Sequence, residues 1–230
     1  MRLELRRIMM AVAASAAAFA GGAWAGEARV TAHVDWTRAP SFSDVAAAYP
    51  AAARTKGKDG EVVLGCATGP EGRLDECRVI SESPRGLGFG GAARGLAAKF
   101  LGPAGSRAQV RFRFSSERLD AQTVERPEWV GLPTPAAFQS AFPDAASKAG
   151  VLKARAVMSC TVDPTGGLTA CEGVGEEPAG YGFAHATLPL APAFRLRIWG
   201  EDGLPVVGGK VRVPIRYDMQ QAGPSAETRP

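Results

Sequence analysis

Four cysteines are the residues of this chain best suited to covalent chemistry, and they form two pairs with identical spacing. Cys66 and Cys77 stand 11 residues apart, and Cys160 and Cys171 repeat that separation. Each pair flanks a turn containing proline and glycine, between two segments with the alternating pattern of a β-hairpin. Because the members of a pair are symmetric about the turn, they face each other across the hairpin, within the Cα separation that a disulfide accepts. We predict the disulfides Cys66–Cys77 and Cys160–Cys171.

Metal binding and redox catalysis are the two other uses of paired cysteines. Structural zinc sites draw on cysteines only about two to four residues apart, and neither pair has that spacing. The only histidines that could complete a site are His33 and His185. A redox C-x-x-C motif is absent from the sequence. The spacing therefore favours structural disulfides, and we expect neither a metal nor a cofactor.

The first 25 residues have the pattern of a signal peptide. Three arginines within the first seven residues precede an apolar run over residues 8–20 and an Ala23-Trp24-Ala25 cleavage motif. A retained inner-membrane anchor is the alternative, but the run is short, whereas a spanning helix needs roughly 20 apolar residues. We expect cleavage of residues 1–25 and export to the periplasm, an oxidising compartment where disulfides persist.

The charge of the chain gives no indication of a nucleic-acid partner. The formal net charge is +4, and removal of residues 1–25 takes away three arginines and one glutamate, which lowers it to +2. The high pI is thus partly a property of the signal. The mature sequence has no concentrated basic field of the kind that binds nucleic acid.

An internal repeat surrounds the cysteine pairs, and such repeats determine how a fold is assigned. Landmarks recur at a displacement of 93: Trp36, Pro40, Tyr49 and Pro50 correspond to Trp129, Pro133, Phe142 and Pro143. Residues 66–100 and 160–194, at a displacement of 94, share 14 identical residues: Cys66, Pro70, Gly72, Leu74, Cys77, Glu82, Pro84, Gly86, Gly88, Phe89, Ala92, Leu96, Ala97 and Phe100. We interpret this pattern as a tandem duplication.

Each copy is predicted to contain a short helix, a hairpin, a longer helix and a final strand. In the first copy these are residues 41–48, 61–68 with 74–81, 90–100 and 109–114. In the second copy the hairpin is 153–162 with 168–174, the helix is shortened by prolines within 183–194, and the last strand is 210–217 with Pro214 favouring an edge or a bulge. The predicted domains are a signal peptide (1–25), module 1 (34–115), a linker (116–127), module 2 (128–218) and a disordered tail (219–230).

No catalytic constellation is present, so we expect that the protein is not an enzyme. The sequence lacks G-x-S-x-G, H-E-x-x-H and P-loop motifs. His185 has glycine at its counterpart in the first copy, which argues against a shared general base. Glu82, Glu176 and Glu177 lie beside Pro-x-Gly turns, where we interpret them as loop-capping or solvated groups rather than acid–base groups. Trp36 and Trp129 are interpreted as packing anchors, with a binding role as the alternative.

Several short motifs occur in the same order in both copies. The first copy has Tyr49-Pro50-x-x-Ala53, Gly60-Glu61-Val62-Val63, Gly72-Arg73 and Val79-Ile80-Ser81-Glu82-Ser83, and the second has Phe142-Pro143, Gly166-Gly167, Gly182-Phe183 and the stretch 211–217. In this order they resemble the TonB C-terminal domain, over about residues 36–114 and 129–217. The Trp-x3-Pro, paired-cysteine and Asp202-Gly203-x-Pro205-Val206 elements more narrowly resemble TonB-like periplasmic proteins of alphaproteobacteria.

The resemblance implies an α+β fold, with a small antiparallel sheet and one main helix per copy. It also implies a protein-interaction module at the cell envelope that contacts outer-membrane transport components and accepts a partner strand on a sheet edge. The residues implied for that edge are Val110, Phe112, Phe114, Val211, Val213, Ile215 and Tyr217. Cell-wall or small-ligand binding in a groove between the copies is an alternative. Self-association, between the two modules or in a homodimer, is another.

Overall fold

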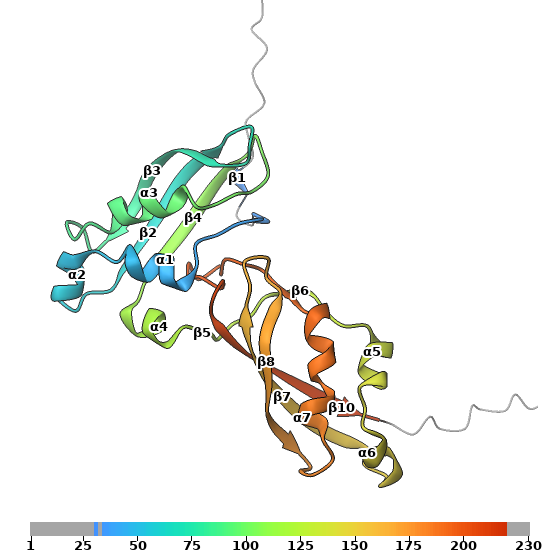
Figure 1. The fold of residues 1–230 in the computed structure, drawn as a ribbon. Helices are drawn as coiled ribbons and strands as arrows, with labels where there is room; N and C mark the ends of the chain where they lie inside the picture. Colours follow the sequence, from blue (N-terminus) through green and yellow to red (C-terminus); the bar gives the residue numbers. More distant parts are fainter. Residues whose placement is uncertain (1–29, 32–33, 220–230) are drawn as a thin grey trace, which may run out of the picture.

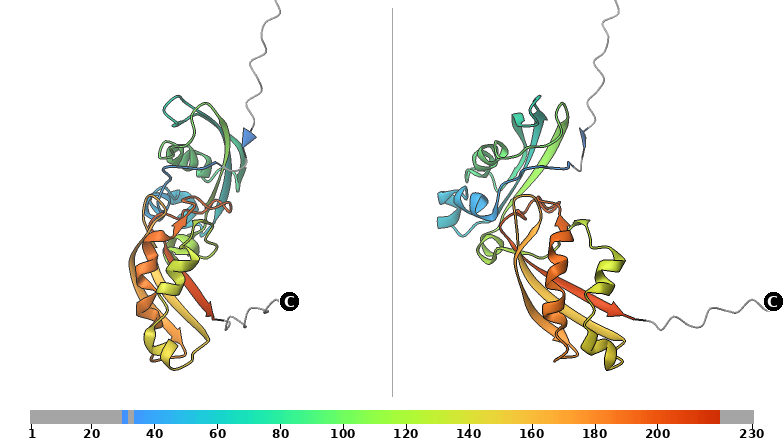
Figure 2. Two further views of the ribbon diagram at one scale, coloured as in Figure 1. Left: turned by 90° about the vertical axis from the view of Figure 1, so that its right-hand side faces the viewer. Right: turned by 45° about the vertical axis from the view of Figure 1, so that its right-hand side comes forward.

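Two four-stranded sheets form the framework of the protein, and each carries its own helices (Figure 1). The computed structural model describes residues 30–31 and 34–219. The two sheets lie in separate lobes, which meet end to end in an elongated molecule (Figure 2). The predicted signal peptide, His33 and the predicted tail beyond Met219 lie outside the described residues.

The first sheet has the strand order β1-β4-β2-β3. Its central hairpin is β2 (Gly60–Thr68) and β3 (Leu74–Ser83), and β4 (Arg107–Phe114) lies antiparallel to β2. The short β1 (Val30–Thr31) pairs parallel with the start of β4. Helices α1 (Phe42–Ala47), α2 (Ala51–Thr55) and α3 (Phe89–Ala97) belong to the same lobe. Alternate residues of β4 are buried, as expected for a strand with one face on a core.

The second sheet has the order β5-β10-β7-β8. Its strands are β5 (Thr123–Val124), β7 (Lys153–Val162), β8 (Leu168–Glu177) and β10 (Lys210–Asp218). A small ribbon joins β6 (Trp129–Gly131) to β9 (Arg195–Leu196). The helices are α5 (Pro135–Ser140), α6 (Asp144–Lys148), α7 (Phe183–Ala186) and a 3₁₀ helix, η1 (Leu188–Ala193).

The two sheets correspond strand by strand and in register. Ala108 of β4 is paired with Cys66, and Val211 of β10 is paired with Cys160. The short parallel strands also match, because β1 meets β4 at Arg107 and β5 meets β10 at Lys210. The α+β architecture with small antiparallel sheets is thus as predicted.

Both predicted disulfides are confirmed, and they lie at β-bulges. Cys66 bonds to Cys77 with a Cα–Cα distance of 4.2 Å, and Cys160 bonds to Cys171 at 4.1 Å. The register of the first hairpin shifts between the pairs Gly65↔Arg78 and Ala67↔Asp75, and the second hairpin shifts at the matching place. The extra residue in each bulge has a positive φ, 49° at Glu76 and 47° at Ala170. The hairpins are therefore less regular than their symmetry about the turn suggests.

The segment 116–127, expected to be a linker, instead carries regular structure. It forms α4 (Ser116–Ala121), in which Leu119 is 2% exposed, followed by β5. The Asp59 carboxylate accepts a hydrogen bond from the Ser116 N–H at 3.1 Å, which satisfies one free donor at the start of the helix. Most of this segment is polar, so its composition did not indicate the buried Leu119 or the strand β5 that pairs with β10.

Two carboxylates cap helices at equivalent positions, which confirms the capping interpretation for Glu82 and Glu176. Glu82 accepts a hydrogen bond from the Gly90 N–H at 3.0 Å, and Glu176 accepts one from the Ala184 N–H at 2.8 Å. The backbone N–H groups of Ala184 and its neighbours hold the pKa of Glu176 below its ordinary value, although partial burial opposes this shift. The prolines of the second copy act as predicted, since α7 ends at Ala186 and continues only as the 3₁₀ helix η1.

Candidate interaction site

Strand β4 presents alternate backbone groups to the outer side of the first sheet. The outward positions include Arg111 and Arg113, because the Arg111 carbonyl oxygen and the Arg113 N–H form hydrogen bonds with groups beyond the sheet. Short β1 covers only Arg107 and Ala108. The rest of this edge would be open to solvent without a segment from the second module.

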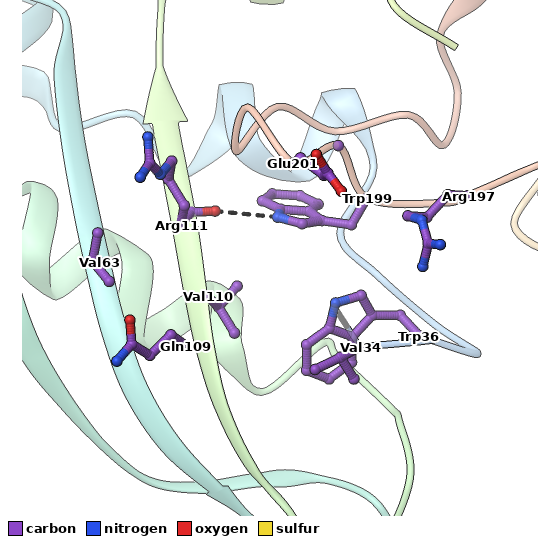
Figure 3. Close-up of a pocket in the computed structure, with 10 residues that line it drawn as sticks. Val34, Trp36, Val63, Gln109, Val110, Arg111, Arg197, Trp199 and Glu201 are labelled. Atoms are coloured by element: carbon purple, nitrogen blue, oxygen red, sulfur yellow. Dashed lines mark hydrogen bonds between the residues drawn. The ribbon is translucent and has the colours of Figure 1, made fainter. Parts of the chain in front are cut away.

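That segment is the docking loop, residues 197–209, which connects β9 to β10 (Figure 1). The Trp199 Nε1–H donates to the Arg111 carbonyl oxygen at 3.1 Å (Figure 3). The Arg113 N–H donates to the Gly203 carbonyl oxygen at 2.8 Å. Further along the loop, the Phe42 N–H donates to the Val207 carbonyl oxygen at 3.0 Å. The second module therefore occupies the β4 edge of the first.

The indole of Trp199 inserts into the aromatic core of the first module. Its ring centroid lies 5.0 Å from that of Phe100 and 5.3 Å from that of Phe112, both in edge arrangements. Only 5% of Trp199 is exposed. Such edge-to-face pairs add to the free energy of burying a large ring. Trp199 is thus an apolar anchor that also satisfies a backbone acceptor.

Gly203 allows the loop to approach β4 closely. Its φ is +80°, and a Cβ there would lie 2.8 Å from the Arg111 Cγ and 3.0 Å from the Arg111 carbonyl oxygen. The turn around it is held by the Asp202 carboxylate, which accepts from the Leu204 N–H at 3.1 Å. A glycine is required here both for the left-handed conformation and for the contact.

Arg197 adds an ionic link at the start of the docking loop. Its guanidinium lies 2.8 Å from the Asp35 carboxylate of the first module and 2.9 Å from the Glu128 carboxylate of the second. About a quarter of the Arg197 side chain is exposed, and Asp35 is almost fully exposed. Solvent screening therefore makes this link weaker than the apolar anchor.

A hollow of about 300 Å³ lies between the modules beside Trp199 (Figure 3). Two indoles, three valines and several polar groups line it: Val34, Trp36, Val63, Gln109, Val110, Arg111, Arg197, Trp199, Gly200 and Glu201. A hollow is therefore present where the ligand-binding alternative would place its site. The two sheets are separate, however, and the modules meet through a loop rather than by joining strands edge to edge.

The second module presents the equivalent edge on β10. The Lys210 N–H points outward to the Gln122 carbonyl oxygen, so the alternate residues Arg212, Pro214 and Arg216 face the same side. Strand β5 ends its pairing at Val211. The N–H of a residue at position 214 would point away from β7. Its absence in Pro214 therefore removes no hydrogen bond between the two strands, which explains how the sheet tolerates a proline.

An apolar hollow of about 300 Å³ lies beside this part of β10. Its lining combines aromatic and aliphatic side chains with the strand itself: Trp129, Leu132, Phe138, Phe194, Val213, Pro214, Ile215 and Arg216. Leu132 is 62% exposed. We call this region the β10 groove.

The structure places all seven residues expected at partner-binding edges inside the two cores: Val110, Phe112, Phe114, Val211, Val213, Ile215 and Tyr217 are each at most 6% exposed. Their backbone groups face β2 or β7, because the intervening residues face outward. Neither β4 nor β10 is outermost in its sheet, since β1 and β5 flank them. A partner at these strands would therefore meet the alternate residues and the groove beside them.

The described residues contain no cluster of three histidine, cysteine or acidic side chains that could hold a metal. His185 lies exposed on α7. Burial, together with the hydrogen bond to Asp59, raises the pKa of Tyr49 to about 12, which suits a structural phenol rather than a proton-transfer group. Within residues 30–31 and 34–219, no helix is long and apolar enough to cross a membrane.

Comparison with known proteins identifies the first module. Residues 45–114 match the family model described as the Gram-negative bacterial TonB protein C-terminal. An uncharacterized protein of Caulobacter vibrioides is 32% identical over 92 residues, which cover 37% of this chain and 92% of the relative. The chain belongs to the TonB C-terminal family. The TonB C-terminal domain is a non-enzymatic, envelope-associated domain that acts in protein interaction.

The docking loop and the β10 groove are the parts of this TonB C-terminal family member that sequence reasoning missed. A signal for the loop was present, because Phe194 to Val211 spans more residues than Phe100 to Val110. The insertion also carries Trp199 and the Asp202-Gly203 turn. Nothing in the sequence indicated that the insertion would dock on the other module.

Proposed function

We propose that this chain is an exported periplasmic protein that binds a protein partner at the cell envelope through the outer edge of its second module. The observation that carries the proposal is the outward-facing backbone of Arg212, Pro214 and Arg216 beside the apolar β10 groove. Unpaired backbone groups next to an apolar hollow are the two components of strand-edge recognition. The family supports protein interaction at the envelope in general.

Two TonB C-terminal-like modules, residues 34–115 and 128–218, are part of this proposal. The identical strand order of the two sheets supports a tandem duplication, as does the matching register at Cys66 and Cys160. We assign α4 and β5, within residues 116–127, to the junction between the modules.

Export through a cleaved signal at residues 1–25 is proposed for the same protein. The two disulfides favour an oxidising compartment such as the periplasm. The partner we propose is an envelope protein, with the outer-membrane transport machinery as the leading class, because the family is associated with the Gram-negative envelope.

A matched pair of variants tests the role of the β10 edge. Arg216→Pro removes the outward N–H, whereas Arg216→Ala removes the side chain and keeps the N–H. After chemical cross-linking in Gram-negative envelope extracts, the wild-type protein and Arg216→Ala should capture the same partner, and Arg216→Pro should lose it. Circular dichroism would establish that both variants are folded. Equal capture by Arg216→Pro would show that this edge is not the binding site.

A further inference from the structure

The residues that hold the Trp199 indole in the first module, which we call the Trp199 seat, are Trp36, Phe100, Arg111 and Phe112. Each of them has a counterpart in the second module. Trp199 contacts Phe100 and Phe112 and bonds to the Arg111 carbonyl oxygen, beside Trp36 (Figure 3). The shared registers make Phe112 equivalent to Ile215 and Arg111 equivalent to Pro214, because Val62↔Phe112 corresponds to Ala156↔Ile215. The repeat makes Phe100 equivalent to Phe194 and Trp36 equivalent to Trp129.

All four counterparts of the seat line the β10 groove: Trp129, Phe194, Pro214 and Ile215. The framework of the seat is also preserved in geometry. Ring centroids of Trp36 and Phe100 are 4.8 Å apart at 65°, and those of Trp129 and Phe194 are 5.1 Å apart at 60°. The place that Trp199 fills in the first module is therefore a hollow of about 300 Å³ in the second.

The helix beside each seat differs in the same way. In the first module α1 buries Phe42 and Val45, and the docking loop covers this helix through the Val207 carbonyl oxygen. Helix α5 occupies the equivalent place in the second module and buries none of its residues. Phe138, the counterpart of Val45, is only partly buried against Phe194. The second module thus lacks the cover that the docking loop gives the first, among the residues described.

The backbone beside the groove favours a loop over an added strand. In the first module the docking loop uses one acceptor and one donor, the Arg111 carbonyl and the Arg113 N–H. The equivalent groups in the second module are the Pro214 carbonyl and the Arg216 N–H. A proline retains its carbonyl acceptor, so β10 offers both groups. A continuous strand would also need an N–H at position 214, which proline cannot supply. Strand β10 can therefore form the same two hydrogen bonds with a loop that β4 forms with the docking loop.

We propose that the β10 groove is the seat for a tryptophan presented on a tight loop of a partner protein. The partner indole N–H donates to the Pro214 carbonyl, and a carbonyl about four residues further along its loop accepts from the Arg216 N–H. This proposal rests on the proposed function, because it names what the partner presents to the β10 edge. Of the four tryptophans in this chain, Trp36, Trp129 and Trp199 already have places in the two modules, and Trp24 lies in the predicted signal.

The docking loop itself supplies the probe for a binding experiment. A backbone-cyclised peptide with the sequence of residues 197–206 would be titrated into the full processed chain and followed by calorimetry. We expect saturable binding that weakens about tenfold or more when the tryptophan of the peptide is replaced by alanine, because buried aromatic anchors dominate such interfaces. Lack of binding at millimolar peptide would overturn the proposal.

Two chain variants locate the binding site of the peptide. Leu132→Asp places a charge in the groove and should abolish binding. Because Leu132 is largely exposed, this substitution should not prevent folding. Ile80→Asp is the matched control, since Ile80 is 52% exposed on the first module, and it should bind normally. Equal binding by Leu132→Asp would mean that the peptide displaces the docking loop instead, which contradicts the proposal. Concentration-dependent dimers that Leu132→Asp abolishes would also contradict it, because a second copy would then be the occupant.

The two experiments fail in distinguishable ways. If the cyclic peptide does not bind but Arg216→Pro still loses its envelope partner, the edge is functional and the tryptophan chemistry is wrong. If Arg216→Pro retains the partner, the proposed function fails whatever the peptide does.

Discussion

Removal of the Trp199 indole should destabilise the protein by separating its modules. Trp199 is 95% buried, contacts Phe100 and Phe112, and donates to the Arg111 carbonyl. Truncation of a buried aromatic side chain to alanine costs about 3–5 kcal/mol. We expect Trp199→Ala to lose a comparable amount, because little of the surroundings can collapse: the turn at Gly203 holds the loop backbone against β4.

Trp199→Phe separates the two contributions of this side chain. Phenylalanine keeps much of the ring burial but removes the N–H, so it should cost roughly 1–3 kcal/mol, mostly from the Arg111 carbonyl that loses its partner. Trp199→Ala should also split a single cooperative transition into two, because the modules would unfold independently.

Urea unfolding followed by far-ultraviolet circular dichroism measures both effects, since this signal does not depend on tryptophan emission. Hydrogen exchange would additionally report loss of protection at the Arg113 amide, which donates to Gly203. A single unchanged transition for Trp199→Ala, with a loss below about 1 kcal/mol, would refute the claim that this anchor holds the modules together.

Two further predictions concern stability. The pKa of Glu176 is lowered in the folded state by backbone N–H groups, so its contribution is complete above the ordinary value of 4.5 and disappears as pH falls through the lowered pKa. Glu176→Gln should therefore cost about 1 kcal/mol near neutral pH and progressively less as the pH is lowered below 4.5, measured by urea unfolding across this range; a cost that does not change with pH would contradict this. Replacing Cys66 and Cys77 together by alanine should cost about 2–3 kcal/mol, because the cross-link closes a short loop. The urea midpoint reports this cost, and a variant as stable as the wild type would show that the cross-link contributes nothing.

The strand framework and the disulfides could be predicted because local patterns determine them. Alternating Val110, Phe112 and Phe114 indicate a strand with one buried face, and the symmetric cysteines indicate their own partners. The interaction edge, by contrast, was implied by the resemblance, and the seven residues named for it lie in the hydrophobic core. An apolar side chain that marks a strand is the side chain that the core buries, and its backbone then faces the neighbouring strand.

The rest depends on contacts between residues far apart in the sequence. The bulge at Glu76 has a positive φ without the glycine that usually signals it. Segment 116–127 is polar except for residues such as Leu119, whose burial depends on the fold around it. The insertion that contains Trp199 was visible as extra length, but its position on β4 follows from the way the two modules pack.

The docking loop makes the contact between the modules heterologous, since a loop of one module meets an edge of the other. In such a contact one module provides the loop and the other provides the edge. A series of identical repeats joined in this way would form an open array rather than a closed one. Here the series stops at one end, because the connection from Phe100 to Val110 in the first module is too short to provide a loop of its own. The chain is therefore a polar unit: its docking loop is already bound to β4, and the β10 groove at the other end is not covered by a loop of this kind among the described residues.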